Sequence, residues 1–366
     1  MAQPIRIGVI GVGFGARVHI PAYISEGLDV VAVCSRREER AIETAERFGI
    51  PRAFTDHRLM LKMAGLDAVA VVTPQELHHA VVMDVLAARK HVICEKPFAT
   101  TLDDAREMWQ AAEAARVTHM IAHEFRFSPA RARVKELIDE EYLGTLHSAF
   151  ITIARGARPG ERRYNPSRDD AELGGGLLWS QGSHSIDCLR HWFGEIEWVS
   201  GKVFTHLGER NTASGEQIQT TADDAFVVTL GFVNGGWASL SATSTASHGS
   251  GVRIEVYGRD GTLVTPQPNV GSANPPPHAK LLGAKTGDDR LADLPIPERL
   301  DPYNDEGHDG LMPMRLLARE FVRGIDKGVS FAPTFYDGYR CQQALHAVRE
   351  SSESGRVLEI PLEARR

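Results

Sequence analysis

Cysteine is scarce in this chain, and its four cysteines lie far apart. Cys34, Cys94, Cys188 and Cys341 form no C-x-x-C pair and show no metal-ligand spacing, so we predict neither a disulfide framework nor a bound metal. Free thiols that stay reduced suit the cytoplasm, where disulfides are rare. We therefore expect a cytoplasmic protein.

Long apolar runs and blocks of basic charge are also missing. No stretch approaches the roughly 18 apolar residues of a membrane span, and the opening MAQPIRIGVIGVG enters a strand pattern without the regions of a signal peptide. The net charge is -7 and the basic residues are dispersed, which disfavours nucleic acid. We expect a small-molecule partner, with no membrane and no nucleic acid.

The chain begins with a pattern that predicts a dinucleotide site. Residues 5–10 (IRIGVI) form a short apolar run, a glycine turn follows, and a second apolar run at 28–34 completes a βαβ unit of about 30 residues. A side chain at the first two glycines would keep the backbone from the pyrophosphate, and a small third residue lets the helix pack on the strand. The expected binding residues of this turn are Gly11, Gly13, Phe14, Gly15 and Ala16.

The end of the second strand indicates which dinucleotide binds. An NAD enzyme usually has Asp or Glu here to hold the ribose 2′-hydroxyl, whereas this chain has Ser35 and Arg36, which suit a 2′-phosphate. NADP(H) is therefore favoured over NAD(H). The alternative is that Arg36 and Arg37 only begin the charged face of the next helix.

Two further strand ends carry candidate residues. The apolar run 66–74 predicts a buried parallel strand ending at Thr73 and Pro74, and a helix over 77–90 begins near His78. The next strand, at 91–94, leads into Glu95 and Lys96. Ligands bind at the carboxyl ends of strands in open α/β sheets, so we expect these five residues to line the cofactor, although a surface histidine and a solvated lysine remain alternatives.

Residues 174–187 (GGGLLWSQGSHSID) carry Ser180, His184 and Asp187 at i, i+4 and i+7, on one face of a predicted helix. A histidine starts from a pKa of about 6.5 and accepts a proton readily near neutral pH. We expect His184 to be catalytic and Asp187 to make structural hydrogen bonds. The alternative is that the glycines permit close packing and that both side chains are structural.

These motifs together resemble the Gfo/Idh/MocA oxidoreductase family. The resemblance is carried by G-x-G-F-G-A-R-V-H-x-P at 11–21, VVTP at 71–74, His78, HVICEKPFA at 91–99 and G-x-H-x-x-D at 182–187. It implies an α/β fold with an N-terminal Rossmann domain over 1–122. An α+β domain with an open, mostly antiparallel sheet would follow over 123–366, and the closing helices could pack back on the first domain. It also implies a homo-dimer or homo-tetramer, often joined through that sheet.

The second domain is expected to contribute strands at 147–154, 197–207, 224–235, 236–246 and 251–264, which alternate or run apolar between turn residues. Two stretches, 154–176 and 272–310, are rich in loop residues, and we expect them to be surface loops or lids over the site.

The resemblance also implies roles for single residues. Lys96 matches the lysine of the family's EKP motif and His184 its histidine, whereas Ser180 stands where the family usually has aspartate. Lys96 would polarise the substrate oxygen, and His184 would act as the base or relay while hydride passes to the nicotinamide. Further candidates for substrate binding are Ser180, Arg126, which could instead pair with Glu124, and, from the two long loops, Arg155, Arg163, Tyr164, Tyr303 and His308.

The sequence thus predicts an NAD(P)-dependent oxidoreductase acting on a secondary alcohol of a sugar, polyol or related cyclic diol. Two alternatives stay open. One is glycoside cleavage through a transient ketone with no net redox change, which the missing aspartate makes worth considering. The other is a regulator that binds the dinucleotide without turnover.

Overall fold

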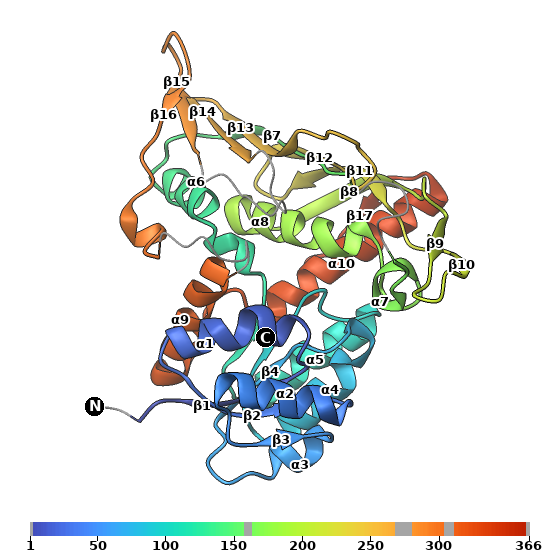
Figure 1. The fold of residues 1–366 in the computed structure, drawn as a ribbon. Coiled ribbons are helices and arrows are strands. Elements are labelled where there is room, and N and C mark those ends of the chain that lie inside the picture. Colours follow the sequence, from blue (N-terminus) through green and yellow to red (C-terminus); the bar gives the residue numbers. More distant parts are fainter. Residues whose placement is uncertain (1–2, 157–162, 268–279, 304–310, 364–366) are drawn as a thin grey trace. The chain divides into compact units, whose positions relative to one another are not determined.

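The computed structural model describes residues 3–156, 163–267, 280–303 and 311–363, and the chain forms two compact units (Figure 1). The first unit comprises Met1–Glu124 and Gly310–Gln342, and the second comprises Phe125–Asp309 and Gln343–Arg366.

The first unit is built on a six-stranded sheet in the order β3-β2-β1-β4-β5-β6. Every adjacent pair of these strands is parallel, and the central strands are buried almost throughout because both faces are covered. This is the Rossmann fold expected from the sequence. The strands are β1 (Arg6–Ile10), β2 (Asp29–Cys34), β3 (Ala53–Phe54), β4 (Ala68–Val71), β5 (His91–Cys94) and β6 (His119–Ile121).

Helices connect these strands, and their ends follow ordinary capping rules. Thr101 Oγ1 accepts the Asp104 N–H at the start of α5, and Gly49 ends α2 with a φ of 66° that favours glycine. Helix α9 packs on α1 within this unit. The helices are α1 (Ile20–Ser25), α2 (Glu38–Phe48), α3 (His57–Leu61), α4 (His78–Ala87), α5 (Leu102–Ala115), α9 (Leu311–Lys327) and the first part of α10 (Phe335–Ser354).

The second unit contains a nine-stranded sheet in the order β16-β15-β14-β13-β7-β12-β11-β8-β17. Only the β7–β12 pair is parallel, so the expected mostly antiparallel sheet is confirmed. Its main strands are β7 (Leu146–Ala154), β8 (Ile196–Phe204), β11 (Ala225–Phe232), β12 (Trp237–Thr243), β13 (Gly251–Gly258) and β14 (Gly261–Gln267). The edges are β17 (Leu358–Glu359), β15 (Leu282–Lys285) and β16 (Ala292–Asp293).

One face of this sheet is covered by α6 (Pro129–Asp139), α8 (Ser183–Phe193) and the end of α10 (Figure 1). Helix α10 is fixed to β8 by the backbone N–H groups of Gly201 and Val203, which donate to Ser351 Oγ (3.0 Å) and Ser352 Oγ (3.1 Å). On the other face, Phe150 contacts Trp237 and Tyr257 with ring centroids 5.3 and 6.0 Å apart. Trp237 remains 40% exposed, so among the described residues this face carries apolar surface that is not covered by a helix.

The expectation that residues 154–176 and 272–310 are loops is wrong for parts of both stretches. Residues 282–285 and 292–293 extend the sheet as β15 and β16, and a helical turn, η5, spans Glu298–Leu300. The small residues of β15 pair with β14, a tertiary contact that a short Gly- and Pro-rich segment does not signal by periodicity. The connector 154–176 contains α7 (Pro166–Asp169). Residues 157–162, 268–279 and 304–310 lie outside the described residues.

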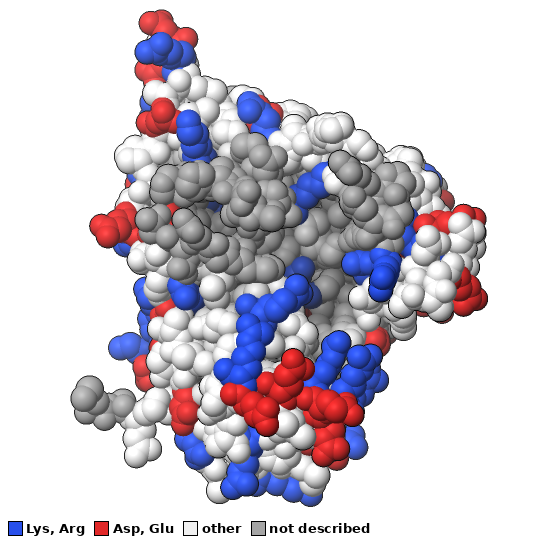
Figure 2. Space-filling view, viewed as in Figure 1, with Lys and Arg blue, Asp and Glu red and all other residues white. Residues whose placement is uncertain are grey.

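Basic and acidic side chains are interspersed over the face shown in Figure 2. Over the described ranges, no helix is long and apolar enough to cross a membrane. No three or more His, Cys, Asp or Glu side chains within these ranges are grouped so that they could hold a metal ion.

Candidate functional site

The glycine turn after β1 has a different reason for glycine at each position. Gly11 has a φ of 104°, and a Cβ there would lie 2.2 Å from the carbonyl oxygen of Val72. The neighbouring strand therefore requires this glycine, where the sequence interpretation assigned it to the pyrophosphate. Gly13 would present a Cβ to open space, as suits a place where a ligand approaches the backbone, and Gly15 would place one 3.1 Å from Val9 on β1.

The turn leads into a five-residue π-helical turn, η1 (Gly15–His19), and then α1. Ala16 is buried, and Phe14 is half-buried, with its ring edge-on to His19 at 5.7 Å between centroids. π-turns are rare and occur often at functional sites. The Gly11 N–H donates to the carbonyl of Cys34 at 2.9 Å, which ties the turn to the end of β2.

Ser35 and Arg36 follow at that end of β2. Ser35 is half-buried, and its Oγ accepts the backbone N–H of Arg37 at 3.2 Å, so the hydroxyl also supports the start of α2. The side chains of Arg36 and Arg37 are exposed. The arrangement leaves the Arg36 guanidinium accessible to a ligand at the carboxyl edge of the sheet.

His78 is buried and contacts the segments that follow two strands, β4 and β5. Its Nε2 contacts the carbonyl of Thr73 at 3.0 Å, and its Nδ1 contacts the carbonyls of Pro97 (3.1 Å) and Phe98 (3.2 Å). Burial lowers the pKa of His78, although these carbonyls and Glu95 oppose the shift. The side chain, 1% exposed, holds Thr73 and Pro74 beside the loop that contains Lys96.

Lys96 follows β5 and is half-buried, with a cis peptide bond to Pro97. Its backbone N–H donates to Glu95 Oε2 at 3.0 Å. Glu95 is 7% exposed, and its Oε1 lies 2.7 Å from His19 Nε2. Burial acts to raise the pKa of Glu95, but the hydrogen bond and charge of His19, together with Lys96, lower it below its ordinary value, so the carboxylate is ionised.

In the second unit, nearby protein atoms leave no room for a side chain at two of the glycines before α8. A Cβ on Gly175 would lie 2.5 Å from the carbonyl oxygen of Arg168, and one on Gly176, where φ is 125°, would lie 2.2 Å from Asp223 Oδ1. Asp223 Oδ2 accepts the Leu178 N–H at 2.8 Å. Close packing on the Arg168 backbone and on Asp223 therefore explains the need for glycine at these two positions.

A π-helical turn, η4 (Leu178–Gly182), precedes α8. Ser180 lies in this turn, and its Oγ donates to the carbonyl of Gly176 at 2.8 Å. His184 and Asp187 lie in α8 and are 4% and 1% exposed.

His184 lies in a stack of three side chains. Its ring is stacked on that of Phe125, with 3.9 Å between the ring centroids and 16° between the ring planes. The guanidinium of Arg131, in α6, lies 4.8 Å from the centroid of the Phe125 ring. The stack fixes the plane of the imidazole. This gives His184 a defined orientation, which acid–base chemistry requires.

Asp187 is paired with Arg126. The Arg126 Nε and Nη2 donate to the two carboxylate oxygens at 2.6 Å each, and both side chains are buried. This bidentate pairing, with Arg126 only 4% exposed, places Arg126 within the protein core. Asp187 has the structural bonds expected of it.

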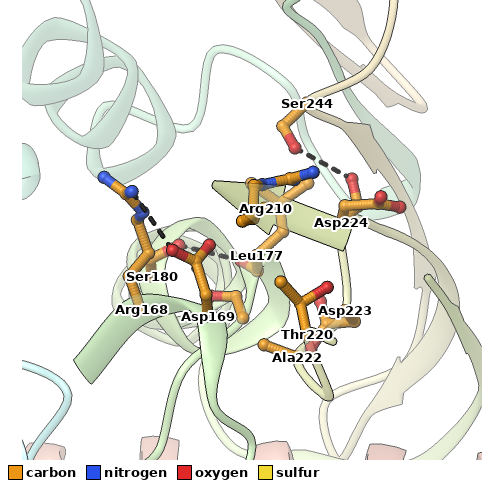
Figure 3. Close-up of a pocket in the computed structure, with 11 residues that line it drawn as sticks. Arg168, Asp169, Leu177, Ser180, Arg210, Thr220, Ala222, Asp223, Asp224 and Ser244 are labelled. Carbon is orange, nitrogen blue, oxygen red and sulfur yellow. Dashed lines mark hydrogen bonds and ion pairs between the residues drawn. The ribbon is translucent and has the colours of Figure 1, made fainter. Parts of the chain in front are cut away.

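A small pocket lies beside Ser180 (Figure 3). Its volume of about 30 Å³ suits a water molecule or two rather than a sugar ring. Burial raises the pKa of its Asp223 to about 6, against the opposing effect of the Leu178 N–H and Arg349. The pocket is lined by Arg168, Asp169, Gly176, Leu177, Ser180, Arg210, Thr220, Ala222, Asp223, Asp224 and Ser244.

The remaining candidates lie in the second unit. Arg155 is half-buried and its N–H donates to the Thr243 carbonyl at 3.0 Å, while Tyr164 is bonded to the Asn211 carbonyl through its N–H at 2.8 Å. Arg163 is exposed and Tyr303 is half-buried. His308 lies outside the described residues.

The sequence interpretation missed the side chains that support these residues. His19, Tyr23, Phe125, Arg131 and Asp223 each contact a candidate residue or its support. His19 stands in the motif that carried the family resemblance and so had a signal. The other four had none, because their importance comes from contacts between distant parts of the chain.

A Rossmann sheet with a glycine turn and a lysine at its carboxyl edge, joined to a mostly antiparallel sheet, defines the class of dinucleotide-dependent oxidoreductases with two units. Residues 5–123 match the model of an oxidoreductase family with an NAD-binding Rossmann fold, and residues 132–264 match the GFO/IDH/MocA C-terminal domain. The chain belongs to the Gfo/Idh/MocA family of oxidoreductases.

Individual relatives agree with this assignment. Levoglucosan dehydrogenase of Pseudarthrobacter phenanthrenivorans is 28% identical over 98% of this chain and 99% of its own. Myo-inositol 2-dehydrogenase of Thermotoga maritima is 28% identical over 71% of this chain and 74% of its own. A structure of levoglucosan dehydrogenase in complex with NADH and levoglucosan matches with a TM-score of 0.85 at 27% identity, over 98% of this chain and 100% of that chain.

Proposed function

We propose that this protein is an NAD(P)-dependent dehydrogenase that moves hydride between the nicotinamide and a secondary alcohol of a sugar, polyol or related cyclic diol. The observation that carries the proposal is the position of Lys96, at the carboxyl end of β5 in a loop held by Glu95 and His78. Ligands bind at this edge of a doubly wound sheet, so Lys96 lies where a substrate would bind beside the cofactor.

In the proposed reaction, the bound nicotinamide accepts or returns the hydride. Lys96 polarises the substrate oxygen, and His184, with its ring fixed on Phe125, takes or relays the hydroxyl proton. Ser180 contributes a hydrogen bond at most, because its hydroxyl donates to Gly176 within its own turn. The glycine turn around Gly13 and Gly15, with Thr73 and Pro74, binds the dinucleotide.

A panel of alcohols with either nucleotide tests the proposal. Levoglucosan and myo-inositol, named in the relatives above, are its first members, followed by other sugars, polyols and cyclic dihydrodiols. Lys96→Ala should lower kcat by on the order of 10²–10⁴-fold. The control is Lys90→Ala, just before the opposite end of β5. Equal turnover by Lys96→Ala and wild type would refute the assigned mechanism.

We also propose a preference for NADP(H) over NAD(H), supported by Ser35 and the exposed Arg36 at the end of β2. Calorimetric titration with each nucleotide measures the preference. Arg36→Ala should weaken NADP(H) binding much more than NAD(H) binding, and Arg37→Ala is the matched control. Tighter binding of NAD(H) by the wild type would show that Arg36 only begins the charged face of α2.

A redox-neutral cleavage is the second candidate, because Ser180 provides no carboxylate where the family usually has one. Such an enzyme would oxidise a hydroxyl-bearing ring carbon to a ketone and eliminate the glycosidic substituent near it. It would then return the hydride from the nicotinamide to the ketone. It would cleave a glycoside without accumulating reduced nucleotide. A steady rise of nicotinamide absorbance with an alcohol substrate favours the dehydrogenase instead.

A homo-dimer or homo-tetramer in the cytoplasm completes the proposal. The uncovered sheet face around Phe150, Trp237 and Tyr257 supports an interface between copies. All four cysteines are free and buried, which suits a reducing compartment.

A further inference from the structure

Three buried polar side chains of the first unit form a hydrogen-bond chain that ends at Lys96. Tyr23 and His19 are fully buried and Glu95 is 7% exposed. Tyr23 Oη lies 2.8 Å from His19 Nδ1, and His19 Nε2 lies 2.7 Å from Glu95 Oε1. The second carboxylate oxygen, Oε2, accepts the backbone N–H of Lys96 at 3.0 Å.

The protonation states of Tyr23 and Glu95 follow from their surroundings. Burial, with a smaller effect of Glu95, raises the pKa of Tyr23 well above its ordinary value, so its hydroxyl keeps its proton. Glu95 is ionised, and its Oε1 accepts a hydrogen bond from His19 Nε2–H. Tyr23 Oη, His19 and the Glu95 carboxylate therefore form a continuous series of hydrogen bonds that ends at the carboxylate.

The loop after β5 is held from a second side by other contacts. His78 contacts the carbonyls of Pro97 and Phe98, and Gln75 Nε2 donates to the carbonyl of Ala99 at 2.7 Å. The Glu95 contact differs from these because it reaches the lysine's own backbone N–H, and because its charge acts on the Lys96 ammonium.

The hydrogen-bond chain also begins in the nucleotide-binding part of the unit. His19 closes η1, which starts at Gly15, and the Phe14 ring contacts the His19 ring edge-on. Burying a carboxylate is unfavourable unless it is paired and hydrogen-bonded, so an apolar side chain would serve packing alone equally well. Here the carboxylate joins the glycine turn to the lysine.

We propose that His19 and Tyr23 are positioning residues for Lys96, acting through Glu95. The chain fixes the lysine backbone, and the charge beside its ammonium, relative to the glycine turn that binds the dinucleotide. This inference rests on the proposed function, in which Lys96 contacts the substrate oxygen. Catalysis is sensitive to such placement, because a displacement of about 1 Å can reduce the rate by on the order of 10²-fold.

The test compares His19→Leu with His19→Gln. Leucine removes the donor to Glu95, whereas the glutamine amide can place an N–H near the position of Nε2. We expect His19→Leu to lower kcat by on the order of 10²-fold, with nucleotide Kd close to wild type, and His19→Gln to recover most of the loss. Turnover is measured with the alcohol of highest kcat in the panel above.

Two further variants separate positioning from folding. Tyr23→Phe removes one hydroxyl with little change in packing and should lower kcat by about fivefold, so it tests the chain even where His19→Leu fails to fold. His57→Leu is the matched control, because His57 Nε2 contacts Asp84 at 2.8 Å in a half-buried pair that does not contact the lysine loop. It should lower the melting temperature without changing kcat.

The outcomes are distinct. Wild-type kcat in folded His19→Leu and Tyr23→Phe, or a loss no greater than that of His57→Leu, overturns the positioning role while an inactive Lys96→Ala leaves the proposed function intact. An active Lys96→Ala defeats the proposed function, and the positioning role with it. Loss of kcat in His19→Leu, rescue by His19→Gln and an inactive Lys96→Ala support both.

Discussion

Single residues at the glycine turn have separable structural and binding roles. Gly11→Ala would press a Cβ against the Val72 carbonyl at a φ of 104°, so we expect a destabilisation of roughly 1–3 kcal/mol. Gly13→Ala meets open space and should keep the wild-type melting temperature while weakening nucleotide binding. Thermal melts and calorimetric titrations of both variants check this. Wild-type affinity in Gly13→Ala would remove Gly13 from the nucleotide site.

Asp223 should make the stability of the protein depend on pH. Burial raises its pKa from 3.8 to about 6, so between these values the folded state binds more protons than the unfolded state. The free energy of unfolding contributed by this group is therefore fully present below about pH 4 and is lost as the pH rises through 6, by up to about 3 kcal/mol.

Asp223→Asn tests this dependence. An amide oxygen can still accept the Leu178 N–H but does not ionise. Denaturant unfolding should give the variant a higher stability than the wild type at pH 8, with the difference shrinking toward pH 4. A difference that is constant across this range would show that Asp223 does not titrate in it.

At the scale of elements, the Arg126–Asp187 pair holds α8 against the turn that precedes α6. Arg126→Met leaves the Asp187 carboxylate buried without its guanidinium, so we expect a loss of about 3–5 kcal/mol in the free energy of unfolding. Replacing both residues by apolar ones should cost less than this single change. The exposed Arg253–Glu255 pair is the control, since Arg253→Met should cost at most about 1 kcal/mol. Urea titrations measure all three.

At the scale of the whole molecule, the uncovered sheet face should determine the assembly. Trp237→Glu puts a charge beside Phe150 on this face, and burial of that charge in an interface would be unfavourable. We therefore expect the variant to form a smaller oligomer, while the fold of each protomer stays as stable as in the wild type. Light scattering after size exclusion measures the mass. Val357→Glu, at another exposed apolar position, is the control and should keep the wild-type mass.

Patterns local in sequence predicted the strands of both sheets and the Rossmann unit well. Apolar runs such as 66–74 and alternation such as 147–154 depend only on neighbouring residues. Strand β4 lies within the first range, and β7 matches the second to within one residue. The strands β15 and β16 were missed because they are short, contain small and polar residues, and exist only through pairing with β14 and with each other. Pairing energy of this kind leaves no periodic signal.

The candidate site divides in the same way. The sequence by itself determined the family, through its motifs, and the placement of Lys96 at a strand end, because a parallel strand directs its carboxyl end to the ligand edge. Only the tertiary structure decided that Val72 requires Gly11, that Asp223 requires Gly176, and that Asp187 is held by Arg126. It also decided that Lys96 follows a carboxylate held by His19. These are contacts between residues distant in sequence, and their energies depend on distances and burial that the order of residues does not contain.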